Sequence, residues 1–329
     1  MTNGSPPSVP DDESEGNGFN GYEMLMQACR SLEAITVAVV HPCDDVSLTG
    51  AIDAAKQGLI IPILVGPIPR MQALAEREGL DLSPYRLVHA EHSHDSAAKS
   101  VELVRLGEVD ALMKGSLHTD ELLAELVNKT TGLRTSRRIS HCFIMDVPTY
   151  PKPLIITDGA VNIAPDLKAK ADICQNAIEL AQVLRIKRPK VAILSAVETV
   201  TPDIPSTLDA AALCKMADRG QITGGILDGP LALDNAISME AARTKKIVSP
   251  VAGQADVLLV PNLEAGNILA KQLTFLARAE AAGIVVGARV PIILTSRADS
   301  VRARLASCAV AVLCVHARRN QLKLSHATA

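Results

Sequence analysis

The feature that most restricts the fold of this chain is a regular alternation of short apolar runs, rich in Val and Ile, with longer amphipathic stretches. Several short runs are continuously apolar, which is typical of strands covered on both faces by helices. We expect strands at residues 35–40, 60–65, 111–114, 142–147, 154–157, 191–195, 225–227, 257–260 and 290–295. The alternation therefore predicts an α/β protein built on a largely parallel sheet.

The stretches between these runs have helical periodicity. We expect helices at about residues 48–58, 96–106, 120–128, 164–184, 205–219, 235–244, 264–281 and 300–316. Asn262 is placed to cap one of them, since its side chain can accept a hydrogen bond from a backbone amide of the first turn. The last helix is apolar on nearly every side, so we expect it to be buried between other elements.

The length and the proline pattern predict two lobes. A chain of 329 residues exceeds the size at which single cores stop growing, roughly 250–300 residues. Prolines crowd the segment around Tyr150, which favours a crossover there, and a second crossover near Thr295 would return the last helix to the first lobe. The predicted division is a disordered tail over 1–20, a discontinuous lobe I of 21–148 plus 296–329, and a lobe II of 149–295.

Composition excludes several classes of partner. The chain has 33 Lys and Arg against 36 Asp and Glu, and only 2% aromatic residues with no Trp, so nucleic-acid binding is disfavoured. No apolar run reaches the roughly 18 residues of a membrane span. Seven scattered cysteines without a C-x-x-C pair predict reduced thiols in a cytoplasmic protein.

Polar and basic residues follow one of the predicted strands and precede another. Lys114, Gly115 and Ser116 follow one strand and open a helix, where free backbone amides can hold an anion, although a plain strand-to-helix turn explains them too. Arg134 and Arg138 precede another strand and could clamp a phosphate with paired hydrogen bonds. A solvated basic turn is the alternative for this second segment.

Carboxylates occupy three further strand ends. Asp158, followed by Asn162, ends a buried strand, and an ionised carboxylate there needs a partner. Asp228 also ends a strand, and turn chemistry alone could explain either one. Ser296, Arg297 and Asp299 stand between a strand and the last helix, where they could hold a phosphate and take a proton, or simply cap the helix.

The common nucleotide and metal motifs are absent. The sequence has no G-x-G-x-x-G, no G-x-x-x-x-G-K-[ST] and no H-E-x-x-H. His89, His92 and His94 are separated by three and two residues, which fits no common zinc pattern. We therefore expect a solvent-exposed loop there, and no metal site.

Seven segments, in chain order, are more specific than any single motif: MKGSLHTDELL, GLRTSRRISHCFIMDVP, ITDGAVNIAP, ILSAVETV, DGPLALDNAIS, SPVAGQADVLLVPNLEAGN and ILTSRADS. Together they resemble the phosphate acetyltransferase and phosphate butyryltransferase family, from about Ile35 to Val315. The resemblance implies reversible transfer of an acetyl or butyryl group between coenzyme A and inorganic phosphate. It also implies a two-lobed α/β/α sandwich like that of isocitrate and isopropylmalate dehydrogenases, with the active site in the cleft between the lobes. A cytoplasmic homodimer with coenzyme A as substrate and no bound cofactor would follow.

The resemblance also implies residue roles. The Ser-Arg pair of the family matches Ser296, which we assign to the carbonyl or oxyanion, and Arg297, which we assign to the phosphate. Direct attack by the coenzyme A thiolate in a ternary complex needs a base. The family's acetyltransferases place an acidic residue further along the following helix, but this stretch reads VRARLAS. Asp299 is the local candidate base, with Asp158 and Asp228 in reserve.

The substrate contacts are expected from Lys114, Gly115, Ser116, Arg134, Arg138, Asp158, Asn162 and Asp228. Two alternatives remain open at this point. One is a non-catalytic, CoA-binding partner module of a hydratase, and the other is a metal-dependent dehydrogenase on the same fold.

Overall fold

The fold is organised around one mixed sheet of 11 strands. The computed structural model describes residues 21–295 and 299–327. The predicted tail, 1–20, and the predicted pair Ser296 and Arg297 lie outside the described residues. The strands are β1 (Ile35–Val40), β2 (Ile60–Gly66), β3 (Arg86–His89), β4 (Ala111–Lys114), β5 (Ser140–Asp146), β6 (Leu154–Thr157), β7 (Lys190–Leu194), β8 (Ile226–Leu231), β9 (Val257–Leu259), β10 (Glu280–Val286) and β11 (Ile292–Ile293). The helices are α1 (Gly21–Cys29), α2 (Asp45–Lys56), α3 (Ile68–Glu78), α4 (Ser93–Arg105), α5 (Thr119–Leu126), α6 (Leu167–Val183), α7 (Pro205–Asp218), α8 (Leu233–Ile237), α9 (Met239–Thr244), α10 (Leu263–Leu276) and α11 (Val301–Ala327).

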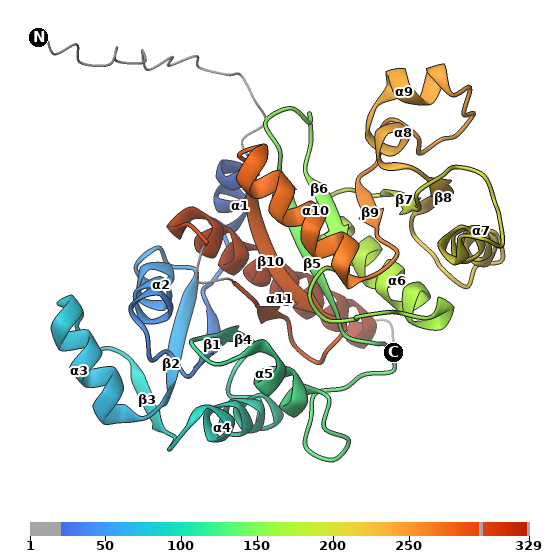
Figure 1. Ribbon diagram of the computed structural model, residues 1–329. Coiled ribbons are helices and arrows are strands. Elements are labelled where there is room, and N and C mark those ends of the chain that lie inside the picture. Colours follow the sequence, from blue (N-terminus) through green and yellow to red (C-terminus); the bar gives the residue numbers. More distant parts are fainter. Residues whose placement is uncertain (1–20, 296–298, 328–329) are drawn as a thin grey trace, which may run out of the picture.

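Two parallel halves make up this sheet, in the order β3-β2-β1-β4-β11-β10-β5-β6-β9-β7-β8 (Figure 1). The strands from β3 to β11 are parallel to one another, and so are those from β6 to β8. β10 and β5 join the halves through three antiparallel pairings. Because three reversals separate the halves, their strands run in opposite directions, and their carboxyl ends lie at opposite edges of the sheet.

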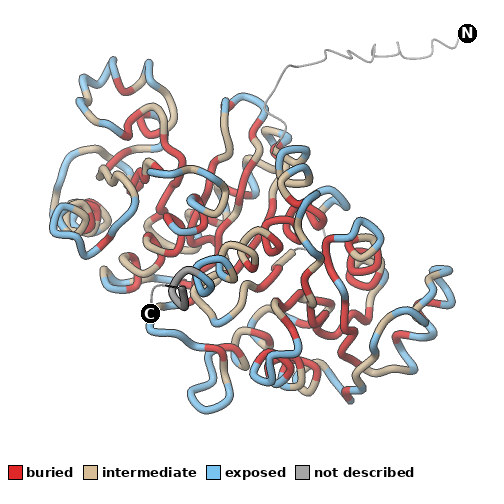
Figure 2. The backbone as a smooth tube through the Cα atoms, turned by 180° about the vertical axis from the view of Figure 1, so that it is seen from behind, coloured by how far each residue is buried: buried red, intermediate tan, exposed pale blue. Residues whose placement is uncertain are grey.

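Helices cover both faces, but they divide the core differently on each. On one face, α1, α2, α3, α6, α7 and α11 share a single hydrophobic core that runs under both halves. On the opposite face, α4 and α5 enclose one core over the first half, and α8, α9 and α10 enclose a second core over the other half. Figure 2 shows that buried residues gather along the central strands and on the inner sides of the helices. The halves are thus joined on one face and separately packed on the other. The division at residues 148 and 296 stays a prediction.

Several sequence predictions are confirmed. β1, β4 and β6 have the predicted bounds. Asn262 caps α10, since its Oδ1 accepts a hydrogen bond of 2.9 Å from the amide of Ala265. The middle of the last helix is buried as expected, with Cys308 through Val312 at most 1% exposed, but α11 continues to Ala327, beyond the predicted end at 316. Among the described residues, no helix is long and apolar enough to cross a membrane.

The main error of the sequence prediction concerns the centre of the sheet. The helix expected over 264–281 ends at Leu276, and β10 begins at Glu280. The sequence EAAG at the start of β10 has ordinary helix propensity. Pairing with strands on both sides, β5 and β11, overrides that propensity. The sequence reading also missed β3, α1 and α3, and it merged α8 with α9.

Candidate functional site

The carboxyl ends of β1, β4 and β11 meet at one edge of the first half of the sheet. Pairing of Met113 with Ile293 places Lys114 level with Leu294, so the segment after β4 lies beside the segment after β11. Backbone amides of Gly115 and Ser116 donate to the carbonyls of Val40 (2.9 Å) and His41 (3.0 Å). The predicted anion-binding segment 114–116 therefore lies beside Thr295, from which the chain continues to Ser296 and Arg297. We call this set of strand ends the first edge.

Glycine at position 115 is required by this meeting of strand ends. A Cβ there would lie 2.6 Å from the carbonyl oxygen of His41 and also against that of Val40. The Ser116 hydroxyl then donates to the His41 carbonyl at 2.8 Å, and the amide of Cys43 donates to the same hydroxyl at 3.3 Å. These hydrogen bonds hold the segment after β1 against the segment after β4.

His41 and Cys43 belong to the first edge and were missed by the sequence analysis. The signal was present, since HPC follows the apolar run 35–40 directly. His41 adopts φ 57°, and its Nδ1 lies 3.0 Å from the Ser96 hydroxyl. Burial lowers the pKa of His41, and the neighbouring Arg70 lowers it further. The lowered pKa favours the neutral imidazole, which lies against Ser96 of α4.

The start of α5 leaves backbone amides without a side-chain cap. Its N-cap residue, His118, makes no capping hydrogen bond within the part of the chain that the structure describes. By contrast, α2 and α6 are capped by Asp44 and Asp166. Open amides at a helix start favour an anion, and here they directly follow the segment 114–116.

Asp158 lies at the other edge of the sheet, where its carboxylate is enclosed by hydrogen-bond donors. It accepts from the amides of Ala160 (2.9 Å), Val161 (3.0 Å) and Asn162 (3.2 Å), and from the Asn162 side-chain amide at 2.6 Å. The Asn162 side chain also donates to the Ile139 carbonyl at 2.9 Å. With four donors and 3% exposure, this carboxylate is arranged to hold the turn after β6 rather than to accept a substrate proton.

His141 is the residue beside Asp158 that the sequence analysis missed, since SHCFIMD reads simply as an apolar strand. Pairing of Cys142 with Thr157 places His141 next to Asp158 across β5 and β6. Its side chain is fully buried, and neither ring nitrogen has a hydrogen-bond partner among the described residues. Burial lowers the pKa of His141 to about 4, although the Asp158 charge acts in the opposite direction.

The basic segment before β5 lies on the same edge as Asp158. A hollow of about 480 Å³ is lined by Arg134 and Arg138, together with residues from the start of α6. Arg137 is ion-paired with Glu179 at 2.6 Å, and this contact raises its pKa. Within the described ranges, neither Arg134 nor Arg138 forms an ion pair, so their guanidinium groups are available to an anionic ligand.

The structure does not bring all the predicted site residues together. Asp228 lies on β8, the last strand of the sheet, and five strands separate β8 from β11. At about 4.8 Å per strand, that separation is roughly 29 Å. Its Oδ1 accepts from the next backbone amide, that of Gly229, at 2.9 Å. Asp228 is therefore remote from the first edge.

The histidine segment forms the end of β3 and the start of α4 rather than the predicted loop. His89 ends β3, His92 caps α4 through a bond of 3.2 Å from the amide of Asp95, and all three histidines are exposed. No group of three or more His, Cys, Asp or Glu side chains within 21–295 and 299–327 is arranged to hold a metal ion.

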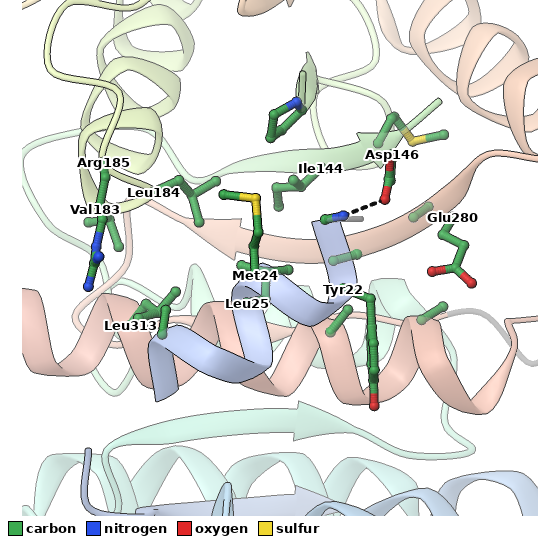
Figure 3. A pocket seen from close by; sticks show the side chains of 18 residues that line it. Tyr22, Met24, Leu25, Ile144, Asp146, Val183, Leu184, Arg185, Glu280 and Leu313 are labelled. Carbon is green, nitrogen blue, oxygen red and sulfur yellow. Dashed lines mark hydrogen bonds between the residues drawn. The ribbon is translucent and has the colours of Figure 1, made fainter. Parts of the chain in front are cut away.

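A separate hollow lies beneath α1 (Figure 3). Met24 and Leu25 of α1 face Ile144 and Leu313 across it, and its volume is about 120 Å³. The Gly21 amide donates to Asp146 at 2.6 Å at its margin. Its lining is mostly apolar, so it offers a packing space rather than the donors that a phosphate needs.

Three comparisons with known proteins bear on this geometry. Residues 88–312 match the family described as phosphate acetyl/butaryl transferase. The phosphate acetyltransferase of Rhizobium meliloti is 61% identical over 298 residues, covering 91% of this chain and 94% of that protein. The phosphate butyryltransferase of Clostridium acetobutylicum is 42% identical over 295 residues, covering 90% and 98%. A solved branched-chain phosphotransacylase from Enterococcus faecalis V583 is 32% identical with a TM-score of 0.75, covering 86% of this chain and 99% of that one, and it confirms the predicted α/β/α fold.

Proposed function

Since this chain belongs to the phosphate acetyl/butyryl transferase family, it is a phosphate acyltransferase, and we propose that it transfers an acetyl or butyryl group between coenzyme A and inorganic phosphate at the first edge. The observation that carries this placement is the meeting of Lys114, Gly115 and Ser116 with Thr295, the residue before the Ser-Arg pair. Neither a non-catalytic module nor a metal-dependent dehydrogenase is favoured, because the similar proteins are named as acyltransferases.

The proposed reaction is a direct transfer. Asp299 takes the proton of the coenzyme A thiol, because the thiolate rather than the thiol is the nucleophile. The thiolate attacks the carbonyl carbon of the acyl phosphate, the tetrahedral oxyanion is stabilised by Ser296, and the leaving phosphate is held by Arg297. The phosphate then takes up the proton. Holding both substrates together supplies much of the rate, so no covalent enzyme intermediate and no bound cofactor are needed.

Arg134 and Arg138 lie at the opposite edge of the sheet, which affects their proposed role. Coenzyme A is an extended molecule whose thiol and phosphates lie at opposite ends. We therefore assign these two arginines to the phosphates of coenzyme A, while the transferred phosphoryl group is bound at the first edge. A cleft between the lobes, a homodimeric assembly and a cytoplasmic location stay predictions.

A thiol assay tests the proposed function. Release of coenzyme A from acetyl-CoA and from butyryl-CoA is followed when phosphate is added, and we expect phosphate-dependent release from at least one of them. Arg297→Ala should remove most of the activity and raise the KM for phosphate, with an unchanged circular dichroism spectrum. Folded wild-type protein that releases no coenzyme A from either thioester would contradict the proposal, and near-normal kinetics of Arg297→Ala would contradict the residue assignment.

A further inference from the structure

Arg304 carries a buried positive charge for which the described residues supply no carboxylate. It is the fourth residue of α11 and is 8% exposed. Two other arginines of the same helix are paired, Arg302 with Glu280 at 2.8 Å and Arg319 with Asp110 at 2.7 Å. Within residues 21–295 and 299–327, Arg304 has no ion pair at all. Of the two arginines of α11 that are not exposed, Arg304 and Arg319, only Arg319 has an ion pair among the described residues.

The surroundings of Arg304 direct its guanidinium group toward the first edge. Nη1 donates to the backbone carbonyl of Asp299 at 2.6 Å, in the segment that joins β11 to α11. A side chain on an α-helix leans toward the helix N-terminus, and Arg304 does so. Asp299 belongs to the chain that leads from β11 into α11, so this hydrogen bond holds the guanidinium at the β11 side of the helix start.

Gly50 of α2 provides the space for this side chain. A Cβ at position 50 would lie 3.0 Å from Nε and 3.1 Å from Cδ of Arg304, and 4.0 Å from the Met113 side chain, which directly precedes Lys114. The Nε atom is buried and has no hydrogen-bond partner among the described residues. The site thus has room for a buried arginine but leaves its Nε donor without a hydrogen-bond partner among the described residues.

Such an arrangement is costly unless a ligand completes it. A buried charge without a counter-ion destabilises the folded protein, because no attraction to an opposite charge offsets the free energy lost when the charge leaves water. The hydrogen bond to Asp299 uses one of the five donors of a guanidinium group. A phosphoryl group supplies both the negative charge and several acceptor oxygens, and arginine matches it in geometry.

We propose that Arg304 binds the transferred phosphoryl group, that of inorganic phosphate or of the acyl phosphate, from the α11 side of the first edge. This inference rests on the proposed function and adds Arg304 to the arginines that the sequence predicted as phosphate ligands, Arg297 and the pair Arg134 and Arg138. Arg304 stabilises the charge on the phosphate as the C–O bond to the acyl group breaks. In the reverse direction it holds phosphate for attack on the thioester.

Arg304→Met is the decisive variant, because it keeps the length of the side chain and removes the charge. Two measurements are made: the rise in Tm caused by inorganic phosphate, which needs no turnover, and the KM values for phosphate and for coenzyme A. We expect the phosphate-induced rise to be largely lost and the KM for phosphate to increase by about tenfold or more, with the KM for coenzyme A unchanged. Without phosphate, the variant should be at least as stable as the wild type.

Arg302→Met is the matched control, since Arg302 lies on the same helix, is 46% exposed and is paired with Glu280. It should leave both phosphate readouts at their wild-type values. A wild-type phosphate response in Arg304→Met would overturn the inference and make Arg304 a structural anchor for Asp299. A rise in the KM for coenzyme A alone would also overturn it, because the phosphates of coenzyme A would then be the ligand.

If Arg304→Met does not fold, Arg304→Lys tests the inference instead. Lysine keeps the positive charge but replaces the planar guanidinium group with a compact ammonium group. The KM for phosphate should then rise several-fold, and an unchanged value overturns the inference. If the wild-type protein releases no coenzyme A, the proposed function is refuted. If the wild-type protein is active but the Arg304 variants keep its response to phosphate, only this inference is refuted.

Discussion

Gly115 lies so close to His41 that a Cβ at position 115 would be 2.6 Å from the His41 carbonyl oxygen. Gly115→Ala must push the ends of β1 and β4 apart, and overpacking of this kind costs about 1–3 kcal/mol. We expect a lower free energy of unfolding in urea and reduced acyl transfer per folded molecule. Gly66→Ala, at the end of β2, is the control. Its nearest contact is the flexible Met71 sulfur at 3.3 Å, so a similar loss there would argue against a special role for Gly115.

Asp158→Asn tests whether the carboxylate is structural. Its oxygens accept four hydrogen bonds, and an amide would turn one acceptor into a donor facing other donors. We expect a loss of about 2–4 kcal/mol in the free energy of unfolding. Asp166→Asn is the control, because Asp166 caps α6 and Asn caps as well. A slower turnover with unchanged stability would instead identify Asp158 as the base.

His141 should make the folded protein sensitive to mild acid. Burial lowers its pKa from 6.5 to about 4, with Asp158 as the ionisable group beside it. Between these values the unfolded chain binds a proton that the folded protein does not, so the contribution to stability is complete above about pH 6.5 and declines toward pH 4. Urea unfolding at pH 7.5 and pH 5 measures the loss. His141→Gln should show a smaller difference between the two, and an equal difference would contradict this account.

Arg137 and Arg138 are neighbours with different surroundings, and they should respond differently to truncation. Arg137 is bound to Glu179, whereas Arg138 lines the hollow of about 480 Å³ and has no ion pair among the described residues. Arg138→Ala should raise the KM for coenzyme A by about tenfold, while Arg137→Ala leaves it near the wild-type value. Steady-state kinetics with phosphate saturating make the comparison. If the KM for coenzyme A is no higher in Arg138→Ala than in Arg137→Ala, the assignment of Arg138 to the coenzyme A site is wrong.

Asp299→Asn tests the base. The substitution keeps the shape of the side chain and removes its ability to take the thiol proton, which should lower kcat by about 10²-fold or more. Binding of coenzyme A, measured by calorimetry, should weaken far less than turnover. An unchanged rate would contradict the assignment of Asp299 as the base.

The sequence by itself determined the strands with continuous apolar runs, the cap at Asn262 and the burial of the last helix. These features depend on neighbours in the chain and on side-chain chemistry, both of which can be read locally. The ordered motifs also determined the family. β10 could not be found in this way, because EAAGIVV becomes a strand only when β5 and β11 pair with it.

Only the tertiary structure decided which motifs lie together. In the sequence, Lys114, Asp158 and Asp228 look equivalent, since each ends or follows a predicted strand. In the structure, Asp228 lies inside β8 rather than at its end. Three antiparallel pairings at the centre place Asp158 at the opposite edge from Lys114, and five strands separate Asp228 from β11. Arg304 gave no signal in the sequence, because an arginine is recognised as unpaired only when every group around it is known. Strand direction and burial depend on distant parts of the chain, so the fold alone fixes them.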